Sequence, residues 1–165
     1  MNNLVTDRVE QSIEVKAPRS RVWQAVADSK QFAEWFGIVV DGPFAPGARL
    51  RGTIVGTTVD AEVAKAQRTH EGTAFDLVVA HMEPERLFSF RWHPNAVDPA
   101  VDYTTEPMTL VEFYLEETAR GTRVRVVESG FDGIPLTRRA QALEGNKEGW
   151  RIMVGVLGAY LDRAS

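Results

Sequence analysis

Three side chains capable of acid–base or hydrogen-bonding chemistry fall on apolar rows of this sequence, and Glu128 is the foremost of them. Glu128 continues the alternation of Val124 and Val126 towards the inner face of an expected strand. A lined pocket typically carries its few polar groups at such positions. There the carboxyl would accept a ligand hydroxyl or act as a base with a pKa raised by burial. The alternative is an outward-facing carboxylate at a strand end, or one bonded to the chain after a bulge.

The two other candidates are His81 and Tyr160. His81 shares the parity of Phe75, Leu77 and Val79, and histidine titrates near neutral pH. A satisfied core or sheet-edge histidine is its structural alternative. Tyr160 falls on the apolar stripe of the expected last helix and would supply a hydroxyl. An enzyme of the cyclase or hydrolase type would use Glu128 with His81 or Tyr160, provided that at least two of the three side chains converge.

Motifs for other chemistries are missing from the sequence. GTIVG at residues 52–56 lacks the lysine and spacing of a phosphate-binding loop, and no GxSxG nucleophile motif occurs. The three histidines lie far apart without HxH or HExxH spacing, and the chain has no cysteine. We therefore expect no metal site and no cofactor.

The elements that must position these residues follow from periodicity. Residues 108–131 alternate with a period of two around a turn at 119–121, which predicts a hairpin with one buried face. Further strands are predicted at 8–17, 49–56, 73–83 and 86–92, and residues 57–66 are expected to continue or bend the second of these. Two short helices are predicted after Pro18 and from Ser29, the latter as a cap. Residues 93–107 form an expected loop, and a long helix follows Pro135.

This order is one strand, two short helices, about five or six further antiparallel strands and a long helix. It predicts an α+β fold in which a curved sheet wraps around the C-terminal helix. The long helix carries apolar residues every three or four positions, but Gly145, Gly149, Gly155 and Gly158 interrupt it. Each glycine costs about 1 kcal/mol relative to alanine, so we expect close contact with the sheet or space for a ligand there. We expect one domain over residues 1–165, with an ordered core at about 9–161.

Composition narrows the functional classes. The formal net charge of −4 argues against nucleic-acid binding, which needs a basic surface. No apolar run approaches the roughly 20 residues that span a bilayer, so we expect no membrane insertion. The first residues lack the basic start and apolar core of a signal peptide, and a cytoplasmic location is therefore expected.

Five segments in sequential order resemble one family. They are APRSRVW (17–23), the Trp35–Phe36 pair, PGARLRG (46–52), EPERLFSFRWHP (83–94) and the hairpin TLVEFYLEE…GTRVRVVESGF, followed by Gly149–Trp150. The chain resembles the SRPBCC (START/Bet v 1-like) superfamily, in the branch similar to the C-terminal domain of the activator of HSP90 ATPase. The resemblance implies a helix-grip fold with an apolar cavity beneath the long helix. Superfamily members bind lipids and other hydrophobic molecules, and some cyclise polyketides.

The leading hypothesis is thus a carrier or sensor that encloses a small hydrophobic or aromatic molecule between sheet and helix. It calls for a pocket above roughly 300 Å³. The candidate cavity residues are Glu128, His81, Tyr160, Trp92, Phe90, Phe75, Phe113, Trp35, Met153 and Leu157. The alternatives are the enzyme described above and a stress-related chaperone partner, which predicts an exposed apolar patch. Nothing here resembles the separate N-terminal domain with which the eukaryotic co-chaperone stimulates its ATPase. A homodimer is left open.

Overall fold

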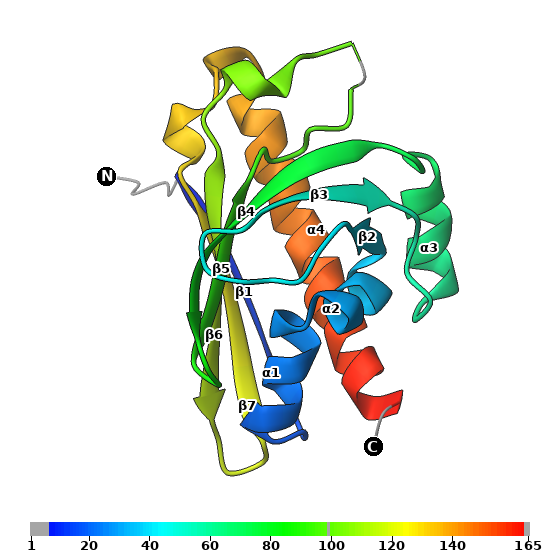
Figure 1. The fold of residues 1–165 in the computed structure, drawn as a ribbon, viewed down its shortest axis with the longest axis vertical. Helices are drawn as coiled ribbons and strands as arrows, with labels where there is room; N and C mark the ends of the chain where they lie inside the picture. The colour runs from blue at the N-terminus through cyan, green and yellow to red at the C-terminus, as the bar shows by residue number, and fades with distance from the viewer. Residues whose placement is uncertain (1–6, 99, 164–165) are drawn as a thin grey trace.

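An antiparallel sheet curves around the long C-terminal helix, as the computed structural model shows for residues 7–98 and 100–163 (Figure 1). The helices are α1 (Arg19–Ala27), α2 (Ser29–Phe36), α3 (Ala61–Arg68) and α4 (Leu136–Arg163), with short 3₁₀ turns at Tyr103–Thr105 and Phe131–Gly133. The strands are β1 (Arg8–Val15), β2 (Ile38–Val40), β3 (Arg49–Ile54), β4 (Ala74–Glu83), β5 (Leu87–Trp92), β6 (Thr109–Glu117) and β7 (Thr122–Ser129).

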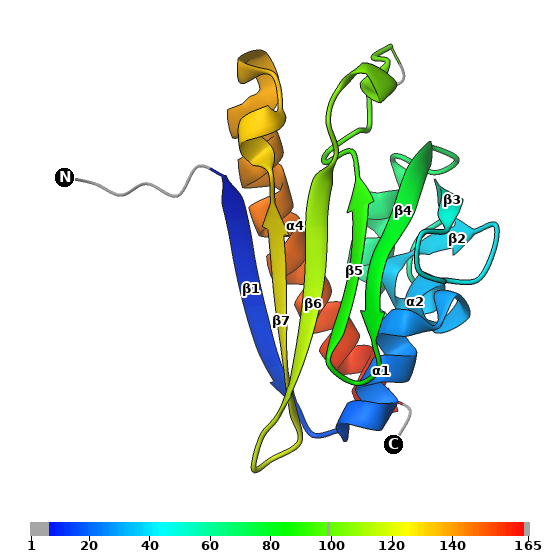
Figure 2. The same ribbon diagram turned by 60° about the vertical axis from the view of Figure 1, so that its left-hand side comes forward.

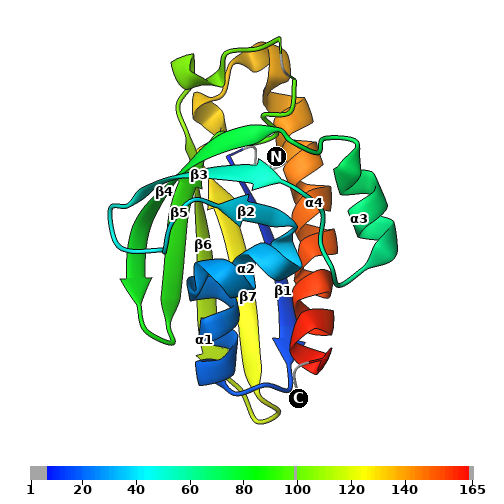
Figure 3. The same cartoon turned by 45° about the vertical axis from the view of Figure 1, so that its right-hand side comes forward.

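The strand order explains why two helices follow the first strand. The sheet runs β1-β7-β6-β5-β4-β3-β2, so the first two strands of the chain lie at opposite edges (Figure 2). Helices α1 and α2 carry the chain from one edge to the other across the concave side, close to α4 (Figure 3). This architecture confirms the predicted α+β helix-grip fold, with β1 and six further strands in the sheet.

Short polar contacts set the boundaries of α1 and α2. Pro18 precedes α1, where its missing N–H is no loss. The cap of α2 is Asp28, whose carboxylate accepts from the backbone N–H of Lys30 at 3.1 Å, and not the expected Ser29, which is the first helical residue. Gly37 ends α2 in the left-handed conformation with φ 90°.

Helix α3 corrects the expectation that residues 57–66 continue a strand. The carboxylate of Asp60 accepts hydrogen bonds from the backbone N–H groups of Glu62 and Val63, at 2.9 and 3.1 Å, and so starts a helix. Among its residues only Ala64 is buried. The apolar stripe of α3 is therefore too narrow for the sequence to show a helical period.

An aromatic core fills the space between the sheet, α2 and α4. Phe32 lies at its centre, with ring centroids 4.9 to 6.4 Å from those of Trp35, Phe36, Phe44, Phe88, Phe90 and Phe113. The expected cavity residues Trp35, Phe90, Phe113 and Leu157 are each no more than 1% exposed and belong to this packed cluster. The region directly between sheet and helix is therefore occupied by side chains.

The glycines of α4 differ in their surroundings. A Cβ on Gly158 would lie 2.8 Å from Cδ1 of Ile13 in β1, which is closer than such atoms approach, whereas nothing lies within 4 Å of a Cβ on Gly155. Gly158 thus permits close packing of α4 on β1, but Gly155 does not serve that purpose.

This difference predicts unequal outcomes for two alanine substitutions on one helix. Gly155→Ala should raise the free energy of unfolding by about 1 kcal/mol, because alanine restricts the unfolded chain and favours the helix. Gly158→Ala should raise the free energy of unfolding by less than this, or lower it, because the Ile13 side chain must move away from the new Cβ. Urea unfolding of both variants measures the difference, and equal gains would contradict a close contact between α4 and β1.

Candidate ligand-binding site

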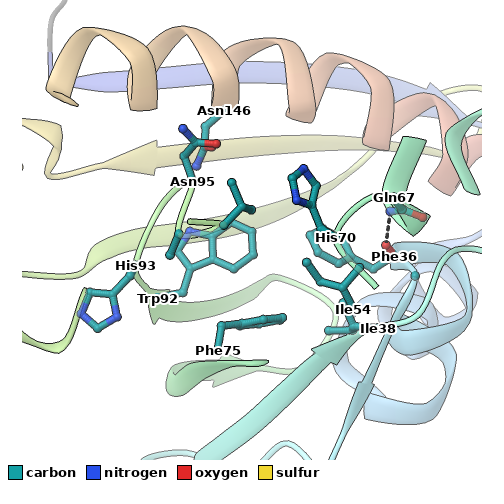
Figure 4. Close-up of a pocket in the computed structure, with 13 residues that line it drawn as sticks. Phe36, Ile38, Ile54, Gln67, His70, Phe75, Trp92, His93, Asn95 and Asn146 are labelled. Carbon is teal, nitrogen blue, oxygen red and sulfur yellow. Dashed lines mark hydrogen bonds between the residues drawn. The ribbon is translucent and has the colours of Figure 1, made fainter. Parts of the chain in front are cut away.

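A pocket of about 220 Å³ opens where the ends of β3, β4 and β5 meet α2, α3 and the segment after β5 (Figure 4). Its apolar wall comes from Phe36, Ile38, Ile54, Phe75, Trp92, Ala96 and Val97. The Trp92 ring packs against those of Phe36 and Phe75, with centroid distances of 5.9 and 6.1 Å. Three aromatic rings therefore surround the space in which an apolar ligand would lie.

A second hollow lies beside the pocket, next to α4. This smaller hollow of about 80 Å³ shares Phe36, Trp92 and Asn146 with the pocket and extends to Gly149, Trp150 and Met153. Of the expected cavity residues, Trp92 and Phe75 line the main pocket, and Trp92 and Met153 line this hollow. The main pocket thus lies at one end of the sheet, not in the space between sheet and helix where the sequence placed the cavity.

Gln67 of α3 holds one wall of the pocket in place. Its amide nitrogen donates to the backbone carbonyl of Phe36 at 2.8 Å, and its amide oxygen accepts from the backbone N–H of Thr57 at 2.8 Å. These two bonds fix α3 against the C-terminal end of α2. Sequence reasoning missed Gln67 because it did not recognise the helix that carries it; the Asp60 cap was the available signal.

Glu128 lies behind the pocket, fully buried, and its carboxylate accepts four hydrogen bonds. Oε2 accepts from Nε1 of Trp92 at 2.8 Å and from Oγ1 of Thr109 at 2.5 Å. Oε1 accepts from Nδ2 of Asn146 and Nε1 of Trp150, each at 2.8 Å. We call these five residues the Glu128 cluster. It contains no cation, and Glu128 takes part in no ion pair among the described residues.

Burial raises the pKa of Glu128 above its ordinary value, because the charged form loses its hydration. The hydrogen bonds from Thr109, Trp92, Trp150 and Asn146 act in the opposite direction, since they stabilise the ionised form. Burial is the larger effect. The carboxyl restricts the orientation of the four donor side chains, because the loss of any one hydrogen bond would leave a buried acceptor unsatisfied.

Two of the donors to Glu128 also line the pocket. Trp92 and Asn146 each present one part to the pocket and one N–H group to the carboxylate. Glu128 itself is not a lining residue of the pocket. Its link to the pocket therefore passes through the indole and the amide, whose orientation it fixes.

A second polar group fastens the segment that closes the pocket on its outer side. Arg138 of α4 donates through Nε and one terminal nitrogen to the Glu106 carboxylate, at 2.9 and 2.6 Å, and the same terminal nitrogen donates to the carbonyl of Pro94 at 3.0 Å. The pair is largely buried, with the two side chains 17% and 11% exposed. Arg138 also lies over the ring of Tyr103. These contacts hold Pro94, Tyr103 and Glu106 against α4.

His81 corrects an expectation. It was expected on the inner face of its strand, but the β4–β5 register shifts between Val79 and His81 and the side chain is exposed. The extra residue of this bulge, Ala80, reverses the alternation, so Met82 takes the inward parity. The Nδ1 atom of His81 lies 3.5 Å from the Ser89 hydroxyl.

Tyr160 is far from the pocket residues along α4. Its hydroxyl donates to the Glu34 carboxylate at 3.0 Å, and Arg21 lies over its ring. Glu128, His81 and Tyr160 therefore occupy three separate places: the buried cluster, the outer face of the sheet and the α1–α2 side of the helix. The acid–base arrangement that the enzyme alternative requires is not formed by these three side chains.

The Glu128 cluster predicts a pH-dependent effect of Glu128→Gln. Glutamine should lower the free energy of unfolding by roughly 1 to 3 kcal/mol, because its amide N–H₂ would face groups that themselves donate. Because the pKa of Glu128 is higher in the folded protein than in the unfolded chain, its protonation stabilises the folded state. This contribution is complete below the pKa of the unfolded chain, about 4.3, and is lost as pH rises through the pKa of the folded state. The margin of the wild type over Glu128→Gln should therefore shrink as pH rises from about 4.

Urea unfolding at a series of pH values tests this prediction. The exposed Glu116→Gln on the neighbouring strand is the matched control and should change the free energy of unfolding little. A margin that grows with pH would mean that the donors outweigh burial.

Arg138→Met should loosen the segment over the pocket. The substitution leaves the largely buried Glu106 carboxylate without its cation, so we expect a loss of about 2 kcal/mol in the free energy of unfolding and faster amide exchange in residues 95–98. The double variant Arg138→Met/Glu106→Gln should recover part of the stability, because it removes the unpaired charge. Unchanged exchange in both variants would exclude the ion pair as the fastening contact.

Comparison with known proteins places this architecture in a family. The family model described as "Activator of Hsp90 ATPase homolog 1-like protein" matches residues 16–162. A search of curated proteins gave no match. Within the part of the chain that the structure describes, no helix is both long and apolar enough to cross a bilayer, and no group of three or more His, Cys, Asp or Glu side chains is arranged to hold a metal ion.

Several solved structures share the fold. Protein MLL2253 from Mesorhizobium loti is 25% identical, with a TM-score of 0.69 over 96% of this chain and 98% of that one. DynU16, a putative protein in the dynemicin biosynthetic locus, is 30% identical with a TM-score of 0.66, and the match covers 96% of this chain but only 48% of DynU16. The Aha1 dimer from Colwellia psychrerythraea has a similar fold, with 16% identity and a TM-score of 0.65. The match covers 93% of this chain and 95% of that one. The family match over most of the chain, together with this fold, shows that the protein belongs to the Activator of Hsp90 ATPase homolog 1-like family.

Proposed function

We propose that the protein binds a small apolar or aromatic molecule in the pocket at the end of the sheet. The observation that carries the proposal is a concave space with aromatic and aliphatic walls and a few polar groups among them. At about 220 Å³ it falls short of the roughly 300 Å³ at which pockets for drug-sized ligands begin. A cavity of about 150 Å³ holds benzene. The size therefore favours a ligand of one ring or two fused rings.

The pocket walls are fastened before any ligand arrives, which supports binding. The Glu128 carboxylate holds Trp92, Gln67 holds α3, and Arg138 holds the segment that carries Ala96 and Val97. A preorganised wall spares the ligand the cost of ordering side chains and loops. Weak ligands of this size can then bind measurably.

The alternatives have less support. The three side chains of the enzyme hypothesis lie apart, as described above. The chaperone hypothesis needs a continuous exposed apolar patch, but the large exposed apolar residues among those described come from separate segments: Val39, Val55, Val101, Leu136 and Ile152. The homodimer, a stress-related role and a cytoplasmic location stay predictions from the sequence.

Titration with one- and two-ring aromatic compounds, followed by ¹⁵N NMR of the tryptophan indoles, tests the proposal. The chain has four tryptophans, so the indole region holds few signals. A ligand in the pocket should shift the Trp92 signal most and leave Trp35 nearly unchanged, because the Trp35 indole is buried and donates to the carbonyl of Ala25. Saturable shifts confined elsewhere, or none, would overturn the proposal.

Two substitutions in one segment give a matched control. Ala96→Trp should fill the pocket and weaken binding at least tenfold, since Ala96 lines it. Ala100→Trp places the same side chain on an exposed position outside the lining and should leave affinity unchanged. Equal effects of the two variants would show that the ligand binds elsewhere.

A further inference from the structure

We propose that the ligand is an aromatic molecule that carries an N–H or O–H donor, and that the carbonyl oxygen Oδ1 of Asn146 accepts this hydrogen bond. The inference rests on the proposed function, because it assigns a ligand class to the same pocket. Three observations carry it: the orientation of the Asn146 amide, the partners of the other polar groups, and the aromatic walls.

The Glu128 cluster fixes which way the Asn146 amide faces. Oε1 of Glu128 accepts from Nε1 of Trp150 and lies 2.8 Å from Nδ2 of Asn146. If the amide were flipped, its carbonyl oxygen would face an oxygen that already acts as an acceptor, and that contact is repulsive. Asn146 must therefore use its N–H₂ group on the carboxylate, and its carbonyl oxygen has no hydrogen-bond partner among the described residues.

This orientation also holds if the carboxyl carries a proton. An indole N–H donates and cannot accept, so neither Trp92 nor Trp150 can receive the proton. The hydroxyl of Thr109 lies 2.5 Å from Oε2 and can accept it. This O···O contact is the shortest of the four that the carboxyl makes, so we place the proton on Oε2, and Oε1 then still accepts from both Trp150 and Asn146.

The other polar groups that line the pocket are either bonded to the protein or able to change between donor and acceptor. The imidazole of His70 is of the second kind, because its two ring nitrogens can exchange these roles. Both ends of the Gln67 amide are bonded to backbone groups, and the indole N–H of Trp92 is bonded to Glu128. Nε2 of His93 faces the carbonyl oxygen of Glu106 at 3.0 Å and so acts as its donor. Asn95 lies at the same end of the pocket as Asn146 (Figure 4) and can turn its amide to suit a ligand. Asn146 is thus the lining group held in the role of an acceptor, and it selects a ligand that carries a hydrogen-bond donor.

The walls favour a flat ring next to this acceptor. Trp92 forms a wall of the pocket and its N–H group is held by Glu128, so its ring is fixed while Phe36 and Phe75 flank it. A ring in this space would make edge and face contacts with the three aromatic side chains. A donor on that ring would reach Asn146, which lines both the pocket and the smaller hollow.

Indole and benzofuran are the matched probes for this inference. The two molecules have nearly the same shape, but only indole carries an N–H donor, and benzofuran is the more hydrophobic. Burial alone would therefore favour benzofuran. We expect indole to bind the wild-type protein about three- to tenfold more tightly, as one net hydrogen bond provides. 1-Methylindole, which lacks the donor, should behave like benzofuran.

The variant Asn146→Leu tests the role of Asn146 directly. Dissociation constants of the probes are measured by NMR titration or calorimetry for this variant and for the wild type. Leucine keeps the approximate volume but removes the acceptor, so indole and benzofuran should then bind with similar affinity. Preference for indole that persists in Asn146→Leu would overturn the assignment of Asn146. If this variant does not fold, the wild-type comparison still decides the ligand class.

The remaining outcomes separate this inference from the proposed function. Equal binding of indole, benzofuran and 1-methylindole to the wild type would overturn the donor class and leave the apolar pocket supported. Failure of all three probes to shift the Trp92 signal would overturn both.

Discussion

A carboxylate buried without a cation is the constraint on which the rest of this structure depends. Burying an ionisable group is costly unless hydrogen bonds replace the lost water, and Glu128 has such bonds from β5, β6 and α4. The donors Trp92 and Thr109 are paired residues of neighbouring strands, while Asn146 and Trp150 are four residues apart on one face of the helix. The cluster therefore fixes the rotation of α4 relative to the sheet as well as two indole rings.

The position of this cluster decides where a ligand has room. Further along the sheet, phenylalanine and tryptophan side chains around Phe32 fill the space between the sheet and the helices. At the Glu128 end, the indole and amide groups are held by the carboxylate, and the space in front of them stays open. Polar anchoring and apolar packing thus divide the interior into a pocket end and a core end. The same division explains why the pocket is small.

Membership in the family accounts for the fold and leaves the ligand undetermined. The same helix-grip architecture appears in MLL2253, in about half of DynU16 and in the Aha1 dimer, at sequence identities between 16% and 30%. A shared fold does not imply a shared activity, because function lies in the side chains of the site. In this chain the informative side chains are Trp92, Asn146 and Glu128, which join the pocket to the buried carboxyl.

Local periodicity in the sequence determined the fold class, the hairpin, the two short helices and the long helix. It also placed Glu128 on a buried row. Both results follow because strand alternation and helical spacing are local properties. It could not place His81, since one extra residue in a bulge reverses the alternation, nor α3, whose apolar stripe is reduced to Ala64. The pocket and the partners of Glu128 were decided by tertiary structure alone. Trp92, Thr109, Asn146 and Trp150 are 18 to 36 residues away from Glu128 in the sequence, and only packing of the helix on the sheet brings them to one carboxylate.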